Sequence, residues 1–179
     1  LSIRRQRQMC IRDRISSLFD KTNEFVGKNI SWFIILMVIV QLAIVMSRYI
    51  YGIGFLKLQE LLIYLHGSLF TLAAGYTLLK DEHVRVDLIY REASQKYKSL
   101  INIFGSLIFL IPFCLLTFST SLPYVRRSWK ILEGSPETSG LNAVFILKTV
   151  LIIFPILLLL QSFSIIIRSS VSLIRKEND

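Results

Sequence analysis

The sequence predicts an all-α integral membrane protein with four transmembrane helices. Hydrophobic residues make up 53% of its 179 residues, somewhat above the roughly 45–50% of soluble domains. Four apolar runs are each long enough to cross a hydrocarbon core of about 30 Å, which takes roughly 20 helical residues. The connectors between them are too short for a soluble domain, so residues 15–179 are predicted to form one membrane domain. The predicted spans are about 30–47, 61–79, 99–122 and 141–167.

Residues 1–14 are expected to be a non-native addition. The string RRQRQMCIRD at residues 4–13 matches one reading frame of a transposase sequencing adapter, and such segments are set aside before a fold is inferred. Without it the net charge falls from +9 to +6, because four Arg and one Asp are removed. The alternative is a genuine basic tail.

The next segment, residues 14–29, is predicted to be an amphipathic helix in the membrane interface. Its apolar residues recur at roughly helical spacing among Asp20, Lys21, Glu24 and Lys28, as in interfacial helices; a flexible tail is the alternative. The first span follows, and Gly52 and Gly54 are expected to end its helix.

Two charged residues flank the connector between the first and second spans. Arg48 closes the first span, where it can extend its charged end to the surface. Glu60 opens the second, where a carboxylate is favoured by the helix dipole. A sharper hypothesis pairs Glu60 with Arg48 or with a partner protein.

The second span carries a stripe of small residues. Gly67, Thr71 and Gly75 are spaced four apart, so they share one helix face, and small residues let another helix approach closely. We therefore expect this face to contact a helix of this chain or of a partner. His66, a lone ionisable group in the same span, is interpreted as a hydrogen-bonded structural histidine.

The densest ionisable cluster follows the second span, in the stretch GYTLLKDEHVRVDLIYR at residues 75–91. If the chain is extended there, His83, Arg85 and Asp87 share one face. If it is helical, His83 and Asp87 pair and Arg85 points away. We expect a hydrogen-bonded and ion-paired knot that fixes the end of the second span. The simpler interpretation is a solvated loop with a topological role.

Pro112 is expected to kink the third span. The connector at residues 123–140 is predicted to be the longest on its side, and it contains the turn-like GSPETSG at residues 134–140. It also carries three basic residues, which are Arg126, Arg127 and Lys130.

Four spans place both termini on one side of the membrane. Outside residues 1–13, and leaving out Lys148 within the fourth span, eleven Lys and Arg lie on that side and five on the other, so both termini are predicted to be cytoplasmic. Most basic residues flank apolar spans. Lipid head groups are therefore the expected partners of these charges, and nucleic acid is not.

The residue types argue against a cofactor. A b-type haem needs two facing histidines, but His66 and His83 lie about 25 Å apart along one helix. Cys10 and Cys114 form no disulfide framework or metal spacing. Self-sufficient secondary transporters usually contain internal repeats, and no repeat is evident in this sequence. An alternative class is a small membrane-anchored enzyme or redox subunit that uses the connector at residues 80–98, and a weaker one is a free-standing channel.

The motifs resemble one known family, the small membrane subunit (DctQ-like, Q-type) of tripartite ATP-independent periplasmic (TRAP) transporters. The resemblance covers about residues 23–174, and its most specific piece is the HVRVD run at residues 83–87. His66 departs from it, because an aromatic residue is expected there. The other matching features are Arg48–Tyr49, Glu60–Leu61, Gly75–Tyr76, Leu78, Ser139 and Pro155.

The resemblance implies a role without catalysis, cofactor or metal, in a bacterial inner membrane. In this family a periplasmic solute-binding protein captures the substrate, commonly an organic acid. A large membrane subunit then moves it inward, driven by an ion gradient. The small subunit scaffolds the large one and helps to receive the binding protein. Arg126, Arg127 and Lys130 would then face an acidic patch on the binding protein, and Arg48 and Glu60 would serve as structural residues on the same side.

Overall fold

The computed structural model describes residues 2–83 and 94–176, and this part of the chain is helical apart from its loops. Four of its helical segments are long and apolar enough to cross a membrane, as the sequence predicts. The elements in chain order are α1 (Ser2–Tyr51), α2 (Leu56–Leu79), α4 (Gln95–Gly105), the π-helical turn η1 (Ser106–Leu110), α5 (Ile111–Lys130) and α6 (Val144–Lys176).

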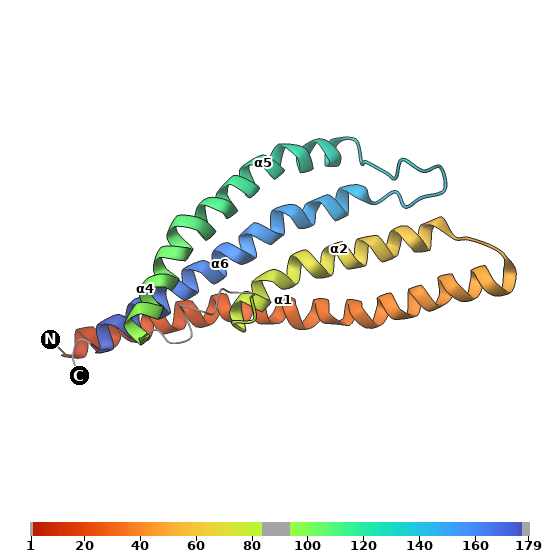
Figure 1. Cartoon of the computed structure of the whole chain (residues 1–179). Helices are drawn as coiled ribbons and strands as arrows, with labels where there is room; N and C mark the ends of the chain where they lie inside the picture. Colours follow the sequence, from red (N-terminus) through yellow and green to blue (C-terminus); the bar gives the residue numbers. More distant parts are fainter. Residues whose placement is uncertain (1, 84–93, 177–179) are drawn as a thin grey trace.

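Helix α6 is the centre of the described structure. It packs against α1, α2, α4, η1 and α5, and no other element contacts all the rest. Figure 1 shows α6 between α5 and α2, with α1 beyond α2. In the most apolar 18-residue window of α6, 39% of residues are buried, against 11% in the corresponding window of each other span. The described chain is thus an open layer built around one helix rather than a closed four-helix bundle.

The helices are longer than the apolar runs that predicted them. The expected interfacial helix at residues 14–29 is not a separate element, because α1 continues without a break from Ser2 to Tyr51. The reason is tertiary packing, since Ser16, Asp20 and Asn23 are buried where this part of α1 meets α6. Gly52 ends α1 as expected, with a left-handed φ of +67° that suits glycine.

The third span also differs from its prediction. It runs from α4 through η1 to the end of α5, so residues 123–130 are helical and not part of a connector. Pro123 lies inside α5. The π-helical turn η1 ends one residue before α5 begins with Ile111 and Pro112, and both π-turns and prolines bend helices. Figure 1 shows this segment curving away from α6 toward the α5–α6 loop.

The polypeptide ends meet at one end of the layer. α1 begins and α6 ends there, while the α1–α2 and α5–α6 loops lie at the opposite end (Figure 1). We call these the termini end and the loop end. Both termini therefore lie on one side of the layer, as four crossings require.

Candidate functional site

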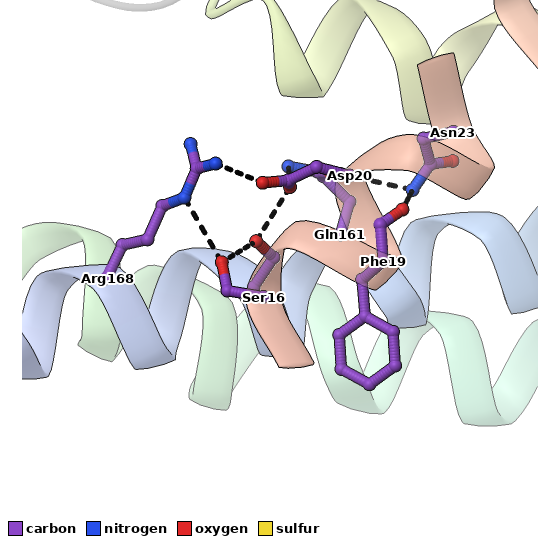
Figure 2. A network of polar contacts seen from close by, with 7 residues as sticks. Ser16, Phe19, Asp20, Asn23, Gln161 and Arg168 are labelled. Carbon is purple, nitrogen blue, oxygen red and sulfur yellow. Dashed lines mark hydrogen bonds and ion pairs between the residues drawn. The ribbon is translucent and has the colours of Figure 1, made fainter. Parts of the chain in front are cut away.

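A partly buried ion pair joins α1 and α6 near the termini end. Arg168 of α6 donates through Nη2 to Oδ2 of Asp20 on α1 (Figure 2). The Asp20 side chain is only 10% exposed, whereas that of Arg168 is 58% exposed. The carboxylate is thus the buried partner, and the guanidinium reaches it from the surface.

Hydroxyl and amide groups complete the surroundings of the Asp20 carboxylate. Ser164 donates to Oδ1 at 2.7 Å and Gln161 to the same oxygen at 3.3 Å. Ser16 lies 2.7 Å from the Ser164 hydroxyl and accepts from Arg168 Nε at 3.1 Å. Because a buried carboxylate is tolerated only when paired and hydrogen-bonded, these contacts explain how Asp20 is accommodated. We call the α1–α6 contact of Ser16, Asp20, Asn23, Gln161, Ser164 and Arg168 the polar seam.

Asn23 forms the innermost part of the polar seam and meets a third helix. Its amide nitrogen donates to Gln161 Oε1 at 3.1 Å and to the Leu157 carbonyl at 3.2 Å. Gly75 of α2 faces it so closely that a Cβ at position 75 would clash with Asn23 Oδ1 and lie 3.2 Å from Leu157 Cβ. The predicted small-residue stripe therefore meets α1 and α6 of the same chain at Gly75.

The rest of the stripe is less tightly packed. A Cβ at Gly67 would make ordinary van der Waals contact with Leu147 Cδ1 of α6, at 3.5 Å. Thr71 turns its hydroxyl back to the Gly67 carbonyl at 2.6 Å, which satisfies the hydroxyl within α2. Close approach thus needs glycine at position 75 and not at position 67.

Glu60 holds the α5–α6 loop against the start of α2 at the loop end. Its Oε1 accepts from the Ser135 hydroxyl, and its Oε2 accepts from the Leu141 backbone N–H at 2.6 Å. A Cβ at Gly140 would lie 2.7 Å from Glu60 Oε1, so the loop needs glycine there. The hypothesised pairing of Glu60 with Arg48 is therefore not seen, because the loop occupies the carboxylate.

A second group of contacts ties α5 to α6 at the same end. Lys148 forms an ion pair with Glu133 at 2.5 Å, and its ammonium lies 4.1 Å from the centroid of the Tyr124 ring. The Lys148 ammonium lowers the pKa of the Glu133 carboxyl below its ordinary value. The Trp129 indole N–H donates to the Thr149 hydroxyl at 2.9 Å, and the indole packs edge-on against the Phe145 ring. These contacts fix the last turns of α5.

The predicted basic residues of this region lie on that fixed part of α5. Arg126, Arg127 and Lys130 are exposed in its last turns. Arg48, at the end of α1, is exposed as well. The described loop end therefore presents basic side chains on a surface held in place by Glu60 and Lys148.

The predicted knot after α2 falls mostly outside the described residues. His83 is described and exposed, whereas Arg85 and Asp87 lie in 84–93, of which the structure says nothing. The polar seam was missed by sequence reasoning, which treated residues 14–29 as an interfacial helix. A signal was present, because Ser16, Asp20 and Asn23 recur at helical spacing and share one face, but its partners lie more than 130 residues away.

His66 differs from its interpretation as a hydrogen-bonded structural histidine. It is exposed, and its imidazole makes no hydrogen bond with any residue that the structure describes. As for other chemistry, residues 2–83 and 94–176 contain no group of three His, Cys, Asp or Glu that could hold a metal ion.

Comparison with protein families identifies a matching family. The model of the DctQ component of tripartite ATP-independent periplasmic transporters matches residues 36–171, about three quarters of the chain. No curated protein and no solved structure matches significantly. The matched region runs from the first span into the last part of α6.

Proposed function

The chain belongs to the DctQ component family of tripartite ATP-independent periplasmic transporters, and from this premise we propose that it scaffolds the large membrane subunit of such a transporter. We propose further that it helps to dock the periplasmic solute-binding protein during ion-gradient-driven uptake of an organic acid. Four apolar helices and the transporter family fit a multi-pass protein of the inner membrane.

One observation supports the scaffold proposal. The described chain buries only a small part of each outer span. In α1, α2 and the α4–α5 segment only 11% of the most apolar window is buried. Large side chains such as Val38 and Leu116 are 63% and 65% exposed. An open layer of this kind offers whole helix faces to a second membrane protein, where close packing and hydrogen bonds drive association.

The docking proposal is supported by charge at the loop end. Arg126, Arg127 and Lys130 are exposed there, and the distribution of basic residues in the sequence predicts that this end is periplasmic. A positive surface increases the rate at which an acidic partner associates. The contacts of Glu60 and Lys148 hold the surface in one shape, so little order must be gained on binding.

Copurification tests the scaffold proposal. The tagged chain is co-expressed with its genomic neighbours, solubilised gently, and its partners are identified by mass. A large multi-span membrane protein in stoichiometric amount is the expected result. A chain that purifies alone and monodisperse contradicts the proposal.

Charge reversal tests the docking proposal. Changing Arg126, Arg127 and Lys130 to Glu should slow association of the solute-binding protein with the reconstituted membrane complex, and the effect should fade at high salt. The matched control reverses two exposed bases of the termini end, Lys21 and Lys96, and should have no effect. Equal effects from both sets would show that docking does not use the loop end.

A further inference from the structure

We propose that a groove between α1 and α2 binds one transmembrane helix of the large subunit, and that this helix forms hydrogen bonds with Gln41 and His66. The inference rests on the proposed scaffold function and specifies which face of the chain performs it. We call this feature the α1–α2 groove. Its lining includes Ile34, Val38, Gln41 and Leu42 of α1 with Ile63 and His66 of α2.

The shape of the α1–α2 groove suits a helix. Ile34, Val38 and Leu42 follow one another at intervals of four, so they form a straight row along α1. They are 50%, 63% and 60% exposed, and Ile63 across the groove is 62% exposed. The space measures about 770 Å³. A row of apolar side chains on each side is the pattern into which the ridge of another helix packs.

Two polar side chains interrupt this apolar lining and lack partners. Gln41 and His66 are both exposed, and neither side chain makes a hydrogen bond with any residue in the described part of the chain. An amide and an imidazole together offer both donors and acceptors. In hydrocarbon such groups are unfavourable unless they are hydrogen-bonded, so their exposure on a spanning helix points to a partner beyond the described residues of this chain.

Both groups lie at matching depth within the expected membrane core. Gln41 precedes Arg48 by seven residues and His66 follows Glu60 by six, which at 1.5 Å per residue places each about 10 Å along its helix from that charged residue. A lipid acyl chain can fill the α1–α2 groove but offers these groups nothing to bond. A helix that presents Ser, Thr, Asn, Gln, Asp or Glu at that depth fills the groove and satisfies both groups.

The exposed face of α5 provides a contrast. Its side chains are largely apolar, and the exposed hydroxyl groups of Ser119 and Thr120 are satisfied within the helix. Ser119 donates to the Leu116 carbonyl at 2.9 Å, and Thr120 donates to the same carbonyl at 2.8 Å. Lipid alone can cover such a face. The unpaired groups are what distinguish the α1–α2 groove from this face of α5.

The first experiment removes the two polar groups without removing bulk. The double variant Gln41→Leu and His66→Leu is co-expressed with the large subunit, and copurification is quantified against wild type. The matched control is Ser119→Ala and Thr120→Ala on α5. An interhelical hydrogen bond changes the association constant by about three- to tenfold. The groove variant should therefore retain no more than about one fifth of the wild-type amount of large subunit, and the control should retain the wild-type amount.

The second experiment locates the contact directly. A photo-crosslinking amino acid replaces Val38 in the groove or Leu116 on α5, two positions of nearly equal exposure. Irradiation should link position 38, and not position 116, to the large subunit. A thermal melt of each isolated variant controls for folding, since the substitutions lie on exposed surface.

The outcomes separate this inference from the scaffold proposal. If the wild-type chain fails to retain the large subunit, the scaffold function itself is wrong. If wild type retains it, normal retention by the double variant overturns the groove assignment and leaves the scaffold function standing. Crosslinks from position 38 only to lipid, or only to a second copy of this chain, overturn it as well.

Discussion

Arg168 and Asp20 form an ion pair across 148 residues of sequence, and the two side chains are unequally buried. This asymmetry predicts that the two partners are unequally sensitive to mutation. Removing the cation leaves a buried carboxylate without its charge partner, whereas removing the carboxylate leaves a guanidinium that can turn into water.

The first prediction therefore compares Arg168→Gln with Asp20→Asn. Arg168→Gln should destabilise the folded chain by about 1–3 kcal/mol, a range reduced from that of fully buried pairs because Arg168 is largely exposed. Asp20→Asn should destabilise it less. Thermal unfolding in detergent measures both, with Lys28→Gln at the exposed Glu24–Lys28 pair as a control without measurable effect. Equal losses from the two variants would contradict the assigned asymmetry.

The second prediction concerns the close approach of Gly75 to Asn23. Gly75→Ala should lower the free energy of unfolding by about 1–3 kcal/mol, because a methyl group has no space between Asn23 and Leu157. Gly67→Ala should be neutral or slightly stabilising, because its Cβ meets only an ordinary contact and alanine favours helix. Parallel thermal melts compare the two variants, and a harmless Gly75→Ala would refute the packing.

The third prediction concerns Glu60 and the α5–α6 loop. Glu60→Gln keeps the size of the side chain but removes the charge that strengthens its bonds to Ser135 and Leu141. Hydrogen exchange at the Leu141 amide should accelerate by roughly tenfold, while exchange in the middle of α6 stays unchanged. Lys57→Gln, an exposed neighbour on α2, serves as control, and unchanged exchange at Leu141 in Glu60→Gln would contradict the prediction.

The fourth prediction follows from the lowered pKa of Glu133. A carboxyl whose pKa is lower in the folded chain than in the unfolded one stabilises the fold above its ordinary pKa of 4.5. That contribution is lost as the pH falls below this value and through the lowered pKa. The difference in melting temperature between wild type and Glu133→Gln should therefore be constant near neutral pH and shrink below pH 4.5. A difference that persists in strong acid would show that the Lys148–Glu133 pair is not its source.

The four membrane-spanning segments could be predicted from the sequence, because each appears as a long apolar run. Their ends could not. Pro123 suggested a connector, yet α5 continues past it, and residues 14–29 looked interfacial because their polar face meets a helix far along the chain. Gly75 was singled out by its spacing, but only the structure distinguishes it from Gly67, since the difference lies in what stands opposite each glycine.

The sequence shows how deep Gln41 lies in its span. It does not show that the Gln41 side chain has no hydrogen-bond partner among the described residues. A single sequence cannot show whether a polar side chain is satisfied by a neighbouring helix. His66 illustrates the same limit, since the expected hydrogen bond is not present among the described residues. Whether a polar side chain is hydrogen-bonded depends on tertiary structure. The lack of such bonds at Gln41 and His66 is what marks the α1–α2 groove.

The separation of the seam partners along the chain has a consequence for biosynthesis. Ser16, Asp20 and Asn23 emerge from the ribosome more than 130 residues before Gln161, Ser164 and Arg168. Chains are made at about 5–20 residues per second, so the polar face of α1 waits many seconds for its partner. Because α6 contacts every other helix in the described part of the chain, a nascent chain stalled before α6 exposes unpaired surfaces that quality-control proteases can recognise.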